Sequence, residues 1–117
     1  MAHSSDGATW SSPEVISPPD EKKRYLDLLP FVFADALGEL NLAWTSSRTD
    51  RHGDILFRAI ADDPANYQQL TTENSNDYDA KVIPARTAGK YLMTWVSNRE
   101  GKTAIFSRLI EIRNLNR

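Results

Sequence analysis

The chain has 117 residues, of which 40% are hydrophobic and 26% charged, the proportions of one ordinary globular domain. It has no cysteine, which excludes a disulfide framework and a thiolate zinc site. The net charge of −2 argues against a nucleic-acid partner, and no apolar run approaches the roughly 20 residues that span a bilayer. Residues 1–7 are polar, so we expect no signal peptide. We also expect no cofactor and no membrane partner, and the sequence leaves the cell compartment open.

Short alternating segments follow one another along the chain. In chain order we expect strands near residues 13–17, 29–34, 39–45, 54–60, 67–71, 80–85, 90–96 and 104–110. Apolar side chains recur at every second position within them, as in residues 40–44, and this is the period of a strand. Residues 31–42 contain several alanines and leucines, but the corresponding segment 82–92 contains a proline and a glycine, which disfavours a helix. The sequence therefore predicts an all-β fold without a long helix.

The chain contains an internal repeat. The sequence AWTSSR of residues 43–48 recurs as TWVSNR at residues 94–99, so that a W-x-S-[SN]-R motif occurs twice. The segment that follows repeats as well, because ILFRAI at residues 55–60 matches IFSRLI at residues 105–110. Two copies of one structural unit therefore fill most of the chain.

A unit of about 50 residues with four antiparallel strands has the size of a propeller blade. The first repeat, about 29–71, holds four expected strands, and the second, about 80–110, holds three. Residues 15–17 resemble residues 69–71 of the outer strand of the first repeat, and we expect residues 13–17 to complete the second repeat. Residues 1–117 are thus expected to form a single β domain.

Residues 38–60 and 89–110 resemble blades of the sialidase-like and Tol-system-like propellers. The shared pattern is a glycine, an alternating strand that ends in W-x-S-x-R, a short turn and an isoleucine-led strand. Residues 5–10, SDGATW, are similar to the sialidase Asp-box but are one residue short between the aspartate and the tryptophan, and an alanine stands in place of the second glycine. The resemblance implies two four-stranded antiparallel propeller-type blades, as a partial or self-assembling β-propeller, a fold shared by many unrelated activities.

Two blades do not close a ring, and open sheet edges tend to associate. Three arrangements remain open. Three chains can form a homo-oligomeric ring of six blades through a head-to-tail contact, the chain can be a fragment of a larger propeller, or residues 13–17 can fold back in another monomeric β arrangement.

The candidate ligand-binding residues are the repeated tryptophan, the repeated arginine and nearby aspartates, namely Trp44, Trp95, Arg48, Arg99, Asp77 and Asp79. A repeated tryptophan either fills the gap between twisted blades, which we favour, or stacks on a sugar. The arginines are expected to meet carboxylates of adjacent loops, which contain Asp27, Asp77 and Asp79. Asp77 or Asp79 is the expected partner of Arg48. The resemblance to sialidases implies instead an arginine that binds a substrate carboxylate.

No residue pattern predicts a catalytic site. His52 lies between two aspartates in a turn, and we expect a polar turn there rather than a metal site. We expect a non-catalytic binding or interaction module that presents loops 45–53, 72–79 and 97–103 to a glycan or a protein partner. The alternative is part of a sialidase-type glycoside hydrolase, which would need a tyrosine nucleophile with acidic partners. A scaffold that recruits other proteins is the third interpretation.

Overall fold

The computed structural model describes residues 2–17, 26–49 and 52–112. These ranges contain seven strands and no helix. The described residues therefore include no helix that could span a membrane. The strands are β1 (Asp27–Ala34), β2 (Leu40–Ser46), β3 (Asp54–Ala59), β4 (Gln68–Gln69), β5 (Asp77–Pro84), β6 (Lys90–Ser97) and β7 (Ala104–Glu111). The expected all-β fold is confirmed.

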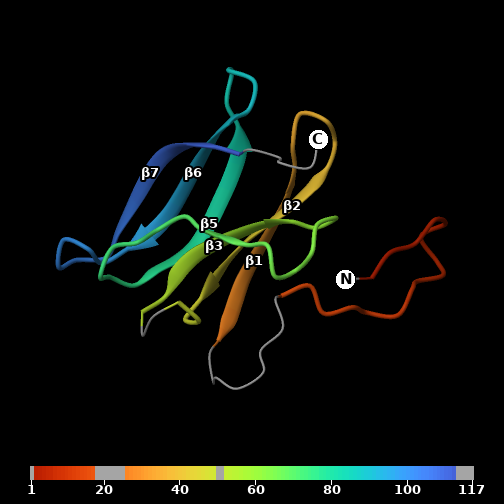
Figure 1. The fold of residues 1–117 in the computed structure, drawn as a ribbon, viewed down its shortest axis with the longest axis horizontal. Coiled ribbons are helices and arrows are strands. Elements are labelled where there is room, and N and C mark those ends of the chain that lie inside the picture. Colours follow the sequence, from red (N-terminus) through yellow and green to blue (C-terminus); the bar gives the residue numbers. More distant parts are fainter. Residues whose placement is uncertain (1, 18–25, 50–51, 113–117) are drawn as a thin grey trace.

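The strands form two antiparallel sheets, one of four strands in the order β1-β2-β3-β4 and one of three strands in the order β5-β6-β7. Figure 1 shows the two sheets next to each other, and β5 packs across β1, β2 and β3. The second sheet has three strands where the sequence predicted four. Residues 13–17 form no strand, so their role as the outer strand of the second sheet stays a prediction.

The repeat in the sequence is also a repeat in the backbone. The first strand of each sheet, which we call its inner strand, contains a register shift. In β1 the shift lies between Leu28 and Phe31, and in β5 it lies between Tyr78 and Lys81. At this irregularity Leu29 has φ 53° and Asp79 has φ 59°. Each sheet therefore places one non-glycine residue in the left-handed region at the same position.

Each sheet has one face that carries the repeated tryptophan and one that does not. The tryptophan face of the first sheet carries Val32, Leu40, Leu42, Trp44, Leu56 and Arg58, and that of the second sheet carries Val82, Tyr91, Met93, Trp95, Phe106 and Arg108. The opposite, isoleucine face carries Phe33, Ala43, Ile55 and Phe57 in the first sheet and Ile83, Leu92, Val96, Ile105 and Leu109 in the second. These assignments follow from the strand register, since successive side chains point to opposite sides of a strand.

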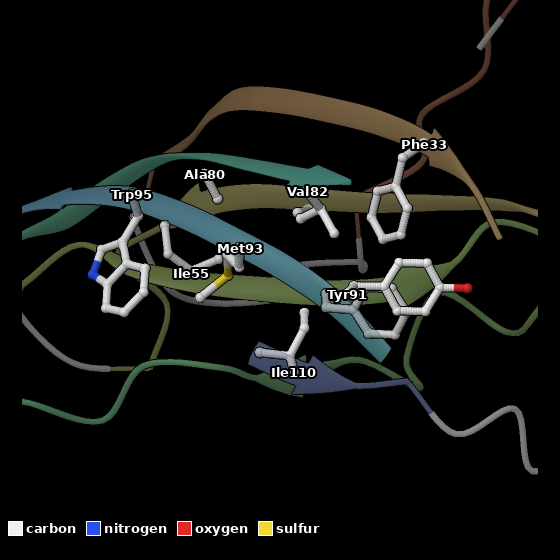
Figure 2. Packing of buried hydrophobic residues seen from close by; sticks show 10 residues of the cluster. Phe33, Ile55, Ala80, Val82, Tyr91, Met93, Trp95 and Ile110 are labelled. Atoms are coloured by element: carbon white, nitrogen blue, oxygen red, sulfur yellow. The ribbon is translucent and has the colours of Figure 1, made fainter. Parts of the chain in front are cut away.

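The main core lies between the isoleucine face of the first sheet and the tryptophan face of the second. Ile55 and Met93 are fully buried in it, and Figure 2 shows Ile55 directed toward Trp95 and Met93. A smaller cluster occupies the tryptophan face of the first sheet, where Ile16 packs beside Trp44. The two sheets therefore stack with unlike faces in contact.

Candidate functional site

The repeated tryptophan and arginine of the first sheet share one carboxylate. Trp44 Nε1 donates to Asp27 Oδ1 at 2.9 Å, and Arg48 Nη2 donates to Asp27 Oδ2 at 2.5 Å. The backbone N–H and Nε of Arg48 both donate to Ser46 Oγ. Asp27 reaches Trp44 Nε1 and Arg48 Nη2 because it is paired with Ser46 in the register of β1 and β2.

The second sheet contains the same unit. Trp95 Nε1 donates to Asp77 Oδ1 at 3.2 Å, and Arg99 Nη2 donates to the same oxygen at 3.3 Å. The backbone N–H and Nε of Arg99 donate to Ser97 Oγ, and Asp77 is paired with Ser97 in the register of β5 and β6. The carboxylate of Asp77 is fully buried, whereas that of Asp27 is 21% exposed.

Both tryptophans are core residues, as the sequence predicted. Trp44 is 2% exposed and Trp95 is 3% exposed, so neither indole presents a stacking surface to solvent. The Arg99 guanidinium lies 5.3 Å from the ring centroid of Trp95 and 5.0 Å from that of Phe106. Each Trp–Asp–Arg–Ser unit thus ties the start of an inner strand to the end of the next strand by charge-assisted hydrogen bonds.

The prediction that Arg48 pairs with Asp77 or Asp79 is wrong, because Arg48 binds Asp27. Asp77 binds Arg99, and Asp79 instead accepts from Lys81 Nζ at 2.6 Å on the surface. The backbone N–H of Asp79 also donates to Thr45 Oγ1, at 3.0 Å, which joins the two sheets. Arg48 binds Asp27 because the strand register brings together the inner strand and the arginine of the same repeat.

A second repeated arginine was not identified from the sequence as a site residue. Arg58 of β3 donates through Nη1 to the backbone carbonyl of Ile16, and Arg108 of β7 donates to that of Leu70. Burial lowers the pKa of Arg58, with Asp62 and Asp63 acting in the opposite direction. The signal for this contact is present in the sequence, because the two arginines occupy one position of the repeat.

The segment that resembles an Asp-box folds as a turn around Asp6. Oδ1 of Asp6 accepts from the backbone N–H groups of Thr9 at 2.7 Å and Ala8 at 2.8 Å, and from the hydroxyl of Ser4 at 3.0 Å. These hydrogen bonds, that of Thr9 first, lower the pKa of Asp6 to about 2. Trp10, which follows the turn, is 62% exposed.

A cavity of about 210 Å³ opens on the tryptophan face of the first sheet. Its walls are formed by Ile16, Ser17, Asp27, Leu28, Pro30, Leu42 and Trp44. The carboxylate at its edge is the one that already binds Trp44 and Arg48. The walls are otherwise mainly apolar, which suits an apolar side chain better than a sugar.

The part of the chain that the structure describes holds no group of three or more histidine, aspartate and glutamate side chains suited to a metal ion. The predicted polar turn about His52 also includes the aspartate at position 50, which lies outside the described residues. Comparison of the chain with protein-family models, with curated proteins and with solved structures found no match.

Proposed function

We propose that the chain is a non-catalytic interaction module of β-propeller type, which binds protein through the outer faces of its two stacked sheets. One observation carries this proposal. The isoleucine face of the second sheet leaves Ile83, Ile105 and Leu109 mostly exposed. The tryptophan face of the first sheet likewise leaves Val32 and Leu40 over 40% exposed. Large apolar side chains exposed together on one face of a sheet mark an interaction site.

The stacking of unlike faces supports the propeller-type interpretation. In a propeller each blade contacts the next through opposite faces, so a pair of blades leaves one face of each kind uncovered. The two Trp–Asp–Arg–Ser units, built from the same residue types at equivalent positions of both sheets, support the view that the sheets are copies of one blade.

The state of the arginines favours an interaction module over a sialidase-type hydrolase. Arg48 and Arg99 are both bound to carboxylates of their own chain, and the side chain of Arg48 is only 5% exposed. A sialidase-type arginine would have to meet the carboxylate of a substrate. The buried tryptophans argue in the same way against stacking on a glycan.

A photoreactive phenylalanine analogue in place of Ile105 tests the proposal in cells that express the chain. We expect covalent adducts with a polypeptide from position 105, and none from the matched control in which Lys102, exposed in the turn before β7, is replaced. The purified chain should not turn over a fluorogenic sialoside. Equal labelling from the two positions, or turnover that is lost in Arg48→Met, would contradict the proposal.

A further inference from the structure

Equivalent positions of the two sheets differ sharply in exposure. Ile55 is 0% exposed, whereas Ile105 at the same position of the second sheet is 79% exposed. The reverse holds on the tryptophan face, where Val82 is 2% exposed and its counterpart Val32 is 46% exposed. Ile55 and Val82 are buried because the two sheets cover each other. Ile105 and Val32 lie where the residues that the structure describes do not make the same contact.

The contacts of Ile55 indicate which contacts a buried Ile105 would make. The Ile55 side chain packs with Ala80, Met93 and Trp95 of the second sheet. Its backbone N–H donates to Thr71 Oγ1 at 3.0 Å, and its carbonyl accepts from the backbone N–H of Leu70 at 2.8 Å. One buried isoleucine thus contacts the next sheet and the two residues that directly follow the outer strand β4 of its own sheet.

Each of these contact residues has a counterpart at the equivalent position of the repeat. Their counterparts are Pro30, Leu42, Trp44, Ser17 and Ile16, and all five line the 210 Å³ cavity of the first sheet. The hydroxyl at the position of Thr71 is retained as Ser17. The cavity is therefore the counterpart of the space that Ile55 fills.

The contacts of Arg58 and Arg108, which are equivalent in the repeat, show where the N-terminal segment lies. Arg108 of the second sheet binds the carbonyl of Leu70, which directly follows the outer strand of the preceding sheet. Arg58 of the first sheet binds the carbonyl of Ile16. Residue 16 therefore lies against the first sheet as the outer strand of a preceding sheet would. Within the described chain β7 is paired only with β6, so its outer edge has no strand neighbour.

We infer that the second sheet of one copy of this chain docks on the tryptophan face of the first sheet of another copy. Ile105 enters the cavity, and residues 14–17 of the receiving copy pair along the outer edge of β7. The intrachain contacts give the hydrogen bonds: Ile16 N–H donates to the Ile105 carbonyl, and Ile105 N–H donates to Ser17 Oγ. The inference rests on the proposed interaction function and names its partner.

A second copy is the occupant because the contact continues the interface already present between the two sheets. The inserted isoleucine and the cavity that receives it are both parts of this chain but lie on different faces. The contact is therefore head-to-tail, and such contacts form rings when the rotation closes. Two, three or four copies give four, six or eight blades, which is the range found in propellers.

Engineered cysteines test the register, since the chain has none of its own. Phe57 is paired with Gln68 in the first sheet, so Ser107 should face Glu14 of another copy. Opposite residues of paired strands have Cβ atoms roughly 4.5–5.5 Å apart, close enough for a disulfide after a small adjustment. On oxidation, Glu14→Cys/Ser107→Cys should give disulfide-linked bands at multiples of the 13.2 kDa chain. Glu14→Cys/Lys102→Cys is the matched control and should remain at one chain.

A disulfide within one chain, or no disulfide at all, would overturn the inference. The proposed function has a separate readout. If adducts from position 105 contain a different polypeptide while the cysteine pair fails to link copies, the interaction function stands and the second copy is the wrong partner. If neither experiment gives a linked product, both fail.

Discussion

Asp77 and Arg99 form an ion pair in which the carboxylate is completely buried, with Nη2 of the arginine 3.3 Å from Oδ1 of the aspartate. The same oxygen accepts from Trp95 Nε1, and the hydroxyl of Ser75 also donates to this carboxylate. A charge inside a protein is tolerated when it is paired and hydrogen-bonded. The pair therefore holds a core tryptophan in place, and removing the pair should lower the free energy of unfolding.

Asp77→Ala should lower the free energy of unfolding by about 3 kcal/mol, because it leaves the Trp95 indole N–H and the Arg99 guanidinium without their acceptor. Urea unfolding at a fixed protein concentration measures the loss. Lys81→Met, which removes a surface ion pair with Asp79, is the control and should cost less than about 1 kcal/mol. Equal losses in the two variants would contradict the structural role of Asp77.

Trp44→Ala and Trp95→Ala should each lower the free energy of unfolding by roughly 3–5 kcal/mol, the range for a buried large aromatic side chain. Trp10→Ala provides the comparison within the chain, since that indole is 62% exposed. Its cost should be within about 0.5 kcal/mol. A similar effect for all three substitutions would contradict the distinction between core and surface tryptophans.

Leu29→Asn should raise the free energy of unfolding by about 0.5 kcal/mol. Leu29 has φ 53° and is 45% exposed, and leucine is strained in the left-handed region, whereas asparagine tolerates it. The second sheet already has Asp79 at this position. Leu28→Asn changes a neighbour of similar exposure without positive φ, and it should destabilise. Thermal unfolding of both variants tests the prediction, and a loss at position 29 as large as at position 28 would contradict it.

Asp6 should titrate at a pH of about 2, well below the ordinary pKa of roughly 3.9 for an aspartate. Since its pKa is lowered in the folded turn, the turn is stabilised above the ordinary value and loses this stabilisation as the pH falls toward 2. NMR titration of the Asp6 carboxyl carbon measures the midpoint. Ser4→Ala removes one of the hydrogen bonds and should move the midpoint upward. A midpoint near the ordinary value in the unchanged chain would contradict the observed turn.

The strands and the buried tryptophans could be predicted from the sequence because both depend on local pattern. Alternation of apolar residues about Trp44 and Trp95 gives the strand period, and the repeat then fixes which strands correspond. These features need no knowledge of how the sheets pack. The lack of a helix among the described residues follows from the same alternation.

The partner of Arg48 could not be derived from the positions of loops alone. Asp27, Asp77 and Asp79 all lie near the expected end of the sheets, and the choice among them depends on the register of β1 with β2. The positive φ of Leu29 is likewise a consequence of the register shift in β1, which no sequence signal marks. Arg58 could have been found, since the repeat places Arg108 at the same position.

The mass of the purified chain in solution tests the central claim that the exposed sheet faces bind one another. Native mass spectrometry should give the mass of two to four copies of the 13.2 kDa chain. Ile105→Asp should give a single chain, because a carboxylate replaces the side chain that enters the cavity. Leu37→Asp, in the β1–β2 turn and 71% exposed, should keep the assembled mass. A single-chain mass for the unchanged protein, or an assembled mass for Ile105→Asp, would contradict the account.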